Sequence, residues 1–145
     1  MFFKFNGYIA AEMIDKQMKR KFQIEYPMRN VSLSVLWGYI GNASGLSDWF
    51  ADEVSVADKI YTFRWNDSEQ EAELLNIRAG NYVRFHWLDE DDEKAYFEFK
   101  IFINDLTADV ALIITDFAEP DEKDDVIELW NKQVNNLRRI AGIIH

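Results

Sequence analysis

The sequence predicts an α+β fold in which a curved antiparallel sheet wraps around one long C-terminal helix. Three features of the chain order predict this architecture. One strand and a short helical pair come first, a long run of alternating, aromatic-rich strands follows, and an amphipathic helix closes the chain. Because a sheet must bury its apolar face, and no other segment is long enough to cover it, we expect the sheet to grip this helix.

Composition indicates a single domain with an aromatic core. The length of 145 residues is typical of one domain. Aromatic residues make up 15% of the chain, with 11 Phe, 6 Tyr and 5 Trp. Since aromatic rings prefer strands and bury large areas, we expect a core that consists largely of rings on the sheet.

Charge and cysteine content exclude several classes of function. With 26 acidic against 16 basic residues the net charge is −10, which opposes binding to nucleic acids and to anionic membrane surfaces. The absence of cysteine excludes disulfides and thiolate chemistry. No apolar run is as long as a membrane span, and the first residues lack the pattern of a secretory signal, so we expect a cytoplasmic protein.

Residues 1–17 lack the clear periodicity of the remaining chain. Met18 stands directly before a basic segment and the first strand, so we predict that residues 1–17 are an N-terminal appendage or precede the true start, and that residues 18–145 form the domain. The alternative is that their aromatic side chains dock on the domain or on a neighbouring chain, because exposed rings on a free tail are unfavourable.

The first predicted strand covers residues 21–26, which alternate in polarity and end at Pro27. Its inward side chains are Phe22, Ile24 and Tyr26. A helix follows that is capped by Asn30 or Ser32 and ends at Ile40, because a short polar side chain can accept hydrogen bonds from the first free amides. The apolar side of this helix is expected to consist of Val35, Leu36, Tyr39 and Ile40.

A second short helical segment is predicted to carry Trp49 and Phe50. Residues 41–45 contain two glycines and are expected to end the first helix, and Ser47 caps the turn that follows. The same residues superficially resemble a glycine-rich phosphate loop. They join two helices and no lysine follows them, so we reject phosphate binding there.

Six further strands are predicted at residues 54–56, 60–65, 69–77, 82–88, 95–104 and 110–115. Their inward faces are rich in rings, with Tyr61, Phe63, Trp65, Val83, Phe85, Trp87, Phe97, Phe99, Ile101 and Ile103. The adjacent Leu74 and Leu75 interrupt the alternation and predict a bulge. Tyr82, Arg84 and His86 share the opposite, outward face of their strand.

The terminal helix is predicted to begin after Pro120 and Asp121, with acidic residues in its first turn that complement the helix dipole. Its apolar residues recur at steps of three and four, which keeps one face towards the sheet. That stripe consists of Val126, Trp130, Val134, Leu137, Ala141 and Ile144.

Five segments carry a resemblance to a known family. They are Gly45-Leu46-Ser47-Asp48-Trp49-Phe50-Ala51-Asp52, Tyr61-Thr62-Phe63-Arg64-Trp65, Val83-Arg84-Phe85-His86-Trp87, Ala111-Leu112-Ile113-Ile114-Thr115-Asp116-Phe117 and Leu129-Trp130. With the order of the elements over residues 18–142, they resemble a small START-like family of uncharacterised bacterial proteins, best known from Bacteroidetes. This family is related to the activators of the heat-shock chaperone ATPase.

The resemblance implies the helix-grip fold of the START-like, SRPBCC or Bet v 1-like proteins. In that fold a curved seven-stranded antiparallel sheet wraps around the C-terminal helix, and two short helices follow the first strand. A cavity between sheet and helix often holds a lipid, sterol, polyketide or other apolar molecule. The resemblance supplies no catalytic signature that could be transferred to this chain.

An aromatic constellation is the leading candidate site, because apolar walls with a few polar groups are typical of small-molecule pockets. The candidate lining residues are Trp49, Phe50, Phe63, Trp65, Phe85, Trp87, Phe97, Phe99, Trp130 and Leu137. The alternative is that these side chains simply fill the core, which is the commonest role of aromatic residues.

Other constellations indicate neither a catalytic nor a metal site. His86 is expected on a solvated face, and His145 is terminal. The acidic residues 89–93 lack the ligand spacing of a calcium loop and predict a solvated hairpin tip. A second acidic cluster, consisting of Asp116, Glu119, Asp121 and Glu122, is attributed to helix capping and surface charge. No serine lies in a nucleophile turn, and we expect no cofactor.

Three functions remain open at this point. The first is non-catalytic binding of an apolar small molecule, oriented by groups such as Tyr61 or Thr115. The second is a protein-interaction or co-chaperone-like role through the acidic surface, or a homodimer. The third is a polyketide-cyclase-like enzyme, which would need an inward acid or base such as Arg64 or Glu98. Strand alternation places both of these outward, so the enzyme ranks last.

Overall fold

The structure is a computed structural model that describes residues 18–142. The predicted appendage, residues 1–17, and the predicted core residue Ile144 lie outside the described residues. Seven strands form one antiparallel sheet in the order β1-β7-β6-β5-β4-β3-β2. They are β1 (Arg20–Pro27), β2 (Glu53–Ala57), β3 (Ile60–Trp65), β4 (Ser68–Arg78), β5 (Tyr82–Trp87), β6 (Phe97–Ile103) and β7 (Val110–Ala118). The helices in this part of the chain are α2 (Leu33–Ile40), α3 (Ala43–Trp49) and α4 (Lys123–Ile140).

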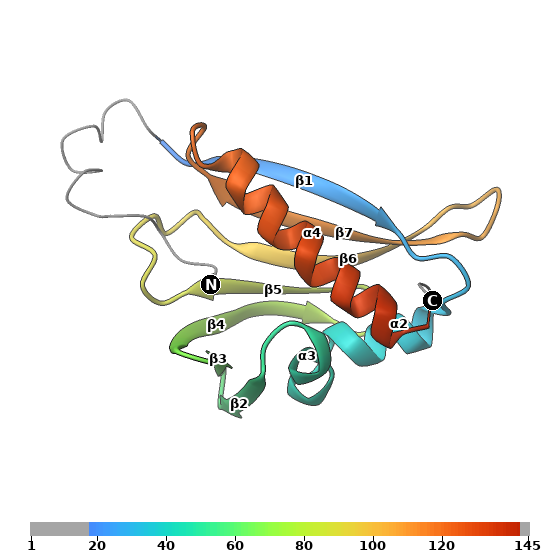
Figure 1. Cartoon of the computed structure of the whole chain (residues 1–145), viewed down its shortest axis with the longest axis horizontal. Coiled ribbons are helices and arrows are strands. Elements are labelled where there is room, and N and C mark those ends of the chain that lie inside the picture. Colours follow the sequence, from blue (N-terminus) through green and yellow to red (C-terminus); the bar gives the residue numbers. More distant parts are fainter. Residues whose placement is uncertain (1–17, 143–145) are drawn as a thin grey trace.

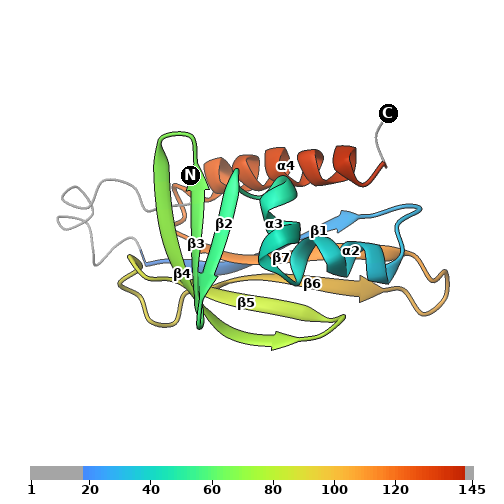
Figure 2. The ribbon, with the colours of Figure 1, turned by 90° about the horizontal axis from the view of Figure 1, so that it is seen from below.

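The sheet curves around α4, as the sequence predicts. Figure 1 shows α4 lying across one face of the sheet, with α2 beside its C-terminal end. In the view turned by 90°, β2, β3 and β4 stand up beside α4 while β1, β6 and β7 pass beneath it (Figure 2). The short helix α3 contacts both β2 and α4. The predicted α+β architecture, a bent antiparallel sheet around a long terminal helix, is therefore confirmed.

Alternation along the strands separates an inner from an outer face. In β5 the side chains of Val83 and Phe85 are 1% and 0% exposed, whereas Tyr82, Arg84 and His86 face the other way and are only half-buried. Each fully buried aliphatic or aromatic side chain contributes about 1.5–3 kcal/mol. The inner face therefore supplies the stability of the sheet, and the outer face is polar.

Strand β4 contains the bulge that the adjacent leucines predict. Its register with β5 shifts between Leu74 and Asn76, which leaves Leu75 47% exposed. Leu74 stays opposite Phe85. A bulge bends its strand and increases the local twist, which suits a strand that must rise beside α4.

Strand β7 extends furthest beyond its predicted limits. We expected a strand over residues 110–115, but β7 continues to Ala118 because its ladder with β1 extends to the pair of Arg20 and Ala118. Strands β5 and β6 are shorter than expected, ending at Trp87 and spanning Phe97–Ile103. The extension of β7 carries Asp116 into the sheet, opposite Phe22.

Helix α2 begins at the second of the two expected caps. The hydroxyl of Ser32 accepts a hydrogen bond from the backbone amide of Val35 at 3.2 Å. Asn30 instead has a positive φ of 65°, which asparagine tolerates in a turn. Leu36 and Ile40 are buried as expected, whereas Val35 is 47% exposed and its predicted place on the apolar side was wrong.

Helix α3 begins earlier than expected. The Asn42 side chain accepts a hydrogen bond from the Gly45 amide at 2.7 Å, so Asn42 is the cap, and Ser47 lies inside the helix. A Cβ atom at Gly45 would lie 2.0 Å from the carbonyl oxygen of Gly38. The glycine at position 45 therefore permits the close packing of α3 on α2 and does not break a helix.

Helix α4 presents the predicted stripe to the sheet. Trp130, Val134 and Leu137 are 0% exposed, while Val126 and Ala141 pack against the core at half burial. Gln133, which the apolar pattern omits, is also buried, with 8% of its surface exposed. Its amide nitrogen donates a hydrogen bond to a backbone oxygen in the core.

Candidate functional site

The structure brings the predicted lining residues together in one aromatic cluster. Phe50 lies at its centre, with its ring centroid 5.2 Å from that of Phe63 and 5.7 Å from that of Trp130. The cluster thereby joins the sheet to α4 through a residue of the α3–β2 connection. All ten predicted residues belong to the cluster or pack directly against it.

Burial divides the cluster into a closed centre and a margin. Phe50, Phe63, Phe85, Phe97, Phe99, Trp130 and Leu137 are 0% exposed, and Trp49 is 2% exposed. Trp65 and Trp87, at the ends of β3 and β5, are only half-buried. That a ligand contacts these residues stays a prediction.

Polar bonds fix the Trp49–Phe50 corner against the sheet and α4. The carbonyl oxygen of Phe50 accepts hydrogen bonds from Trp65 Nε1 at 2.8 Å and from Gln133 Nε2 at 3.0 Å. Asn136 Nδ2 donates to the carbonyl oxygen of Trp49 at 3.1 Å. Gln133 is buried because a backbone oxygen in the core needs its donor.

Asp116 is a polar group on the inner face that the sequence analysis missed. It follows Leu112 and Ile114 at steps of two in β7, and Trp130 Nε1 of α4 donates to its Oδ2 at 2.8 Å. Burial raises the pKa of the Asp116 carboxyl to about 7, against the opposing effect of the hydrogen bonds from Trp130 and the Phe117 amide. Its assignment to surface charge was therefore wrong.

Asp116 belongs to a group of polar side chains near the start of α4, here called the polar rim. The polar rim consists of Lys19, Gln70, Asp89, Glu90, Asp116 and Glu122. Lys19 and Glu90 form an ion pair, and both influence the pKa of Asp116 electrostatically. Lys19 also acts on Glu122. Figures 1 and 2 both place the β5–β6 loop, the start of β1 and the start of α4 at the same end of the molecule.

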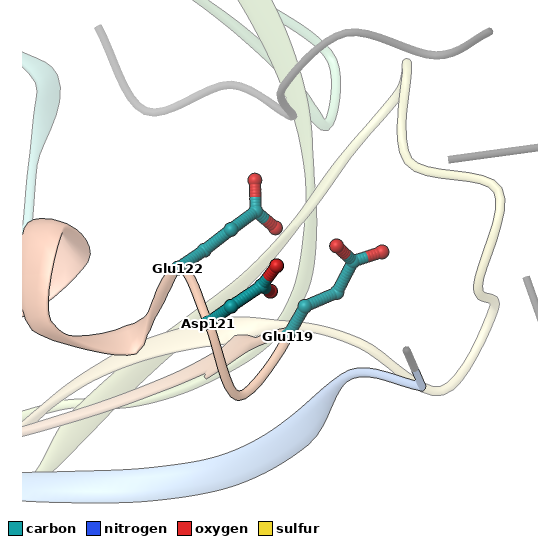
Figure 3. A group of neighbouring side chains, drawn as sticks. All are labelled: Glu119, Asp121 and Glu122. Atoms are coloured by element: carbon teal, nitrogen blue, oxygen red, sulfur yellow. The ribbon is translucent and has the colours of Figure 1, made fainter. Parts of the chain in front are cut away.

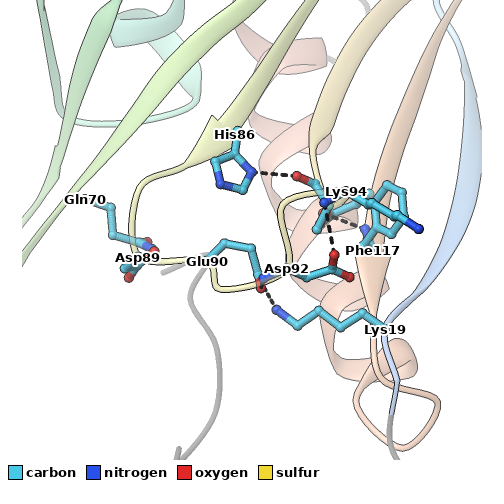
Figure 4. Close-up of polar contacts among 10 residues, drawn as sticks. Lys19, Gln70, His86, Asp89, Glu90, Asp92, Lys94 and Phe117 are labelled. Carbon is cyan, nitrogen blue, oxygen red and sulfur yellow. Dashed lines mark hydrogen bonds and ion pairs between the residues drawn. The ribbon is translucent and has the colours of Figure 1, made fainter.

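The acidic β5–β6 loop is largely exposed, as predicted, and hydrogen bonds hold part of it. Gln70 Nε2 donates to Asp89 Oδ2 at 3.5 Å, the outer limit of a hydrogen bond, and Glu90 accepts from the Asp92 amide at 2.8 Å (Figure 4). The Glu90 side chain is only 11% exposed. Glu90 therefore folds back against the domain, while Asp89, Asp91 and Glu93 remain exposed to solvent as predicted.

Three carboxylates gather where β7 leads into α4. Oxygen atoms of Glu119, Asp121 and Glu122 lie within 4.8 Å of one another (Figure 3). Burial is the main cause that raises the pKa of Glu122 to about 7. The Glu119 carboxyl, with which Glu122 shares a hydrogen bond, raises it further. Glu122 stands at the cap position of α4 but makes no side-chain capping bond, so the predicted capping role was wrong for this residue.

The outer face carries the polar residues that the alternation assigns to it. Arg84 pairs with Glu98 at 2.7 Å and stacks on Tyr96, with its Cζ 4.1 Å from the ring centroid. Glu98 is only 6% exposed, because its neighbours on the same face cover it. Arg64 pairs at 3.3 Å with the exposed Glu53. Arg64 and Glu98, the two side chains that the sequence analysis considered for an enzyme, both lie outside the aromatic cluster, as strand alternation predicts.

A concave, polar feature lies at the β3–β4 turn. Its lining is Asp52, Glu53, Arg64, Trp65, Asn66, Asp67, Ser68 and Glu69. It is broadly open to solvent, and its charged side chains face one another in pairs such as Arg64 with Glu69 at 3.7 Å. The sequence analysis did not predict this feature.

None of the helices described over residues 18–142 is long and apolar enough to cross a membrane.

Comparison with known proteins agrees with this geometry. The model of the START-like superfamily domain matches residues 15–143. BfR322 from Bacteroides fragilis, known from a solution NMR structure, is 46% identical with a TM-score of 0.62, and the match covers 88% of this chain and 94% of that one. No curated protein matches the chain.

Two more distant structures share the fold alone. The Aha1 dimer from Colwellia psychrerythraea is 12% identical with a TM-score of 0.62, over 86% of this chain and 93% of that one. DynU16, a protein of the dynemicin biosynthetic locus, is also 12% identical with a TM-score of 0.62, over 83% of this chain and 46% of that one. The family model covers most of the chain, and the sheet, its order and the gripped helix all agree with it: the chain belongs to the START-like superfamily.

Proposed function

We propose that the protein is a non-catalytic binding module for a small molecule with an apolar, lipid-like or aromatic body, held between the sheet and α4. START-like domains commonly bind hydrophobic ligands, which supports this proposal. The observation that carries it is the margin of the aromatic cluster. There the half-buried rings of Trp65 and Trp87 lie on the same face as the buried amide of Gln70, and small-molecule sites combine apolar walls with few polar groups in this way.

The apolar body of the ligand supplies the affinity in this proposal. Each CH2 group moved from water into an apolar site contributes about 0.8 kcal/mol, which corresponds to about a fourfold decrease in Kd. A series of straight-chain alcohols should therefore bind with a regular gain per carbon until the space is filled. Alcohols suit this test because they carry no charge that could act on the acidic protein.

Displacement of the neutral fluorescent probe N-phenyl-1-naphthylamine measures this series directly. We expect Val126→Trp, which enlarges a half-buried side chain of α4 that faces the cluster, to weaken displacement about tenfold or more. Asn135→Trp on the exposed face of the same helix is the matched control and should bind like the parent protein. If probe and alcohols do not bind at all, or if both variants bind equally well, the proposed site is wrong.

A second candidate function, contact with a protein partner, rests on the opposite end of the molecule. The β6–β7 hairpin exposes Phe102, Ile103 and Leu106, and Leu106 is 95% exposed. Exposed apolar clusters are typical of contact surfaces, and one structural relative is described as a dimer. Light scattering of the parent and of Leu106→Asp tests a second copy as the partner. A monomeric parent protein at all concentrations would exclude the homodimer.

A further inference from the structure

The polar rim contains hydrogen-bond acceptors that lack donors. Gln70 is 9% exposed, and its Oε1 is buried without a partner, while its Nε2 faces the Asp89 carboxylate. Glu122 Oε2 is also buried without a partner. In the part of the chain that the structure describes, these two are the buried side-chain oxygens without a hydrogen bond. A buried oxygen without a donor is unfavourable, so both atoms are suited to a group that donates.

The orientation of the Gln70 amide follows from its neighbour. A carboxylate accepts hydrogen bonds and cannot donate, so the amide nitrogen must point at Asp89 and the amide oxygen must point away from it. Gln70 is directly opposite Phe63 in the β3–β4 ladder and therefore lies on the inner face. Its free oxygen is thus next to the aromatic cluster and not on the outer surface.

Protein donors at this end of the sheet already serve other acceptors. Lys19 pairs with Glu90, and Trp130 Nε1 donates to Asp116. Trp65 Nε1 donates to the carbonyl oxygen of Phe50. In the part of the chain that the structure describes, none of these three donors reaches Gln70 Oε1 or Glu122 Oε2.

Charge at the polar rim has one sign in excess. Asp89, Glu90, Asp116 and Glu122 are acidic. Lys19 is the basic member of the polar rim, and its charge lowers the pKa of Asp116 and that of Glu122. A ligand carboxylate would meet like charge and would offer no donor to Gln70 Oε1 or Glu122 Oε2. An ammonium group would meet opposite charge and would offer three donors.

We propose that the ligand is an amphiphile whose polar group is a cationic amine, with its apolar body among the aromatic rings and its ammonium group at the polar rim, where the free oxygen of Gln70 accepts from it. This inference rests on the binding function proposed above. It names the chemical class of the ligand. The unpartnered acceptors favour a group that donates hydrogen bonds, and the acidic side chains of the polar rim favour a group with a positive charge. It excludes fatty acids as ligands of this site.

The test compares three ligands of equal chain length, namely decylamine, decanol and decanoate, by displacement of N-phenyl-1-naphthylamine below their micellar concentrations. It is carried out at about pH 8, above the raised pKa of Asp116 and that of Glu122. We expect decylamine to bind about tenfold or more tightly than decanoate, with decanol between them. Gln70→Leu and Glu122→Gln should each reduce the ratio of amine to carboxylate affinity by about threefold or more. Glu128→Gln removes the same charge from the exposed face of α4 and should leave the ratio unchanged.

The outcomes separate this inference from the binding function. Decanoate binding as tightly as decylamine would overturn the amine assignment and leave the apolar site intact. A preference for the amine that vanishes at about 0.5 M NaCl, and that Gln70→Leu and Glu122→Gln do not alter, is long-range attraction to an acidic protein and also overturns it. Failure of all three ligands to displace the probe would remove the binding function itself, and this inference with it.

Discussion

Replacing Asp116 by asparagine tests how the inner face of the sheet tolerates a carboxylate. Asparagine keeps the size of the side chain and an oxygen that can accept the Trp130 indole hydrogen bond, but it carries no charge at any pH. The pKa of Asp116 is raised to about 7 by burial, whereas an exposed aspartate has a pKa of 3.8. The folded protein therefore holds a proton on Asp116 over a pH range in which the unfolded chain has lost it.

The sign of the pH dependence follows from this difference in proton binding. Below about pH 4 both states are protonated and Asp116 has no effect on the free energy of unfolding. As the pH rises towards 7 the folded state binds more protons than the unfolded state, so the free energy of unfolding falls, and above 7 it becomes constant. One pKa unit corresponds to about 1.4 kcal/mol, so the loss between pH 5 and pH 8 amounts to about 3 kcal/mol. Because part of the side chain reaches solvent, this figure is an upper value.

Urea denaturation followed by tryptophan fluorescence from pH 5 to pH 8 measures the effect. We expect the parent protein to lose stability across this range and Asp116→Asn to lose less by up to about 3 kcal/mol. Near pH 8 the variant should be the more stable protein, by about 1–3 kcal/mol after subtraction of one weakened hydrogen bond, since asparagine has a single acceptor for the Trp130 and Phe117 donors.

Glu122 titrates in the same range and needs a separate control. Burial and Glu119 raise its pKa to about 7 as well, so part of the slope of the parent protein belongs to Glu122. Glu122→Gln isolates that part, and the double variant with Asp116→Asn should be nearly independent of pH over this range. Equal slopes for the parent protein and Asp116→Asn would refute the reasoning, because Asp116 would then be ionised in the folded protein at pH 5.

Three further predictions concern packing and the outer face. Gly45→Ala should destabilise the protein by more than about 2 kcal/mol, because the new Cβ atom would overlap the Gly38 carbonyl oxygen. At Gly38 a new Cβ atom would have no atom within 4 Å, so Gly38→Ala should stabilise the helix by about 0.5–1 kcal/mol. Phe50→Ala should cost about 3–5 kcal/mol, since the ring is 0% exposed at the centre of the aromatic cluster. Glu98→Gln should cost about 1 kcal/mol at neutral pH, because its partner Arg84 is partly exposed to solvent. Urea denaturation of each variant checks these values, and a stable Gly45→Ala protein or a neutral Phe50→Ala change would contradict the packing described here.

The fold was predictable because periodicity and length decide it. The alternation of Val83 and Phe85 with polar neighbours sets the faces of β5, and the steps of Trp130, Val134 and Leu137 orient α4. These patterns repeat over many residues, so no single position decides the outcome. The limits of the elements were less predictable, because they depend on a partner that is distant in sequence, as for β7 and β1.

The polar part of the candidate site was missed for a related reason. Asp116 was assigned to the surface because an aspartate argues against a strand, yet the steps from Leu112 through Ile114 lead directly to it. Gln133 was omitted from the stripe of α4 for the same reason, although it lies between buried positions. Polar residues at inward positions of a regular pattern were the available signal. Sequence reasoning discards this signal when it assigns every polar residue to the outside.

The two ends of α4 have chemically different surroundings, and for the ligand proposed above this difference favours one direction of entry. At the α2 end, Leu36, Ile40 and Leu137 are buried. Near the end of α4, Arg138 Nη2 donates a hydrogen bond to the Pro27 carbonyl oxygen at 2.8 Å. A ligand entering at the α2 end would have to separate these packed apolar side chains. Its polar group would find no hydrogen-bond partner among them. At the start of α4 the margin is half-buried and the acceptors of the polar rim are free. In the proposed binding mode, the ligand enters apolar end first at the polar rim and keeps its polar group near water until the free oxygen of Gln70 receives it. This end is therefore the entrance that costs least desolvation.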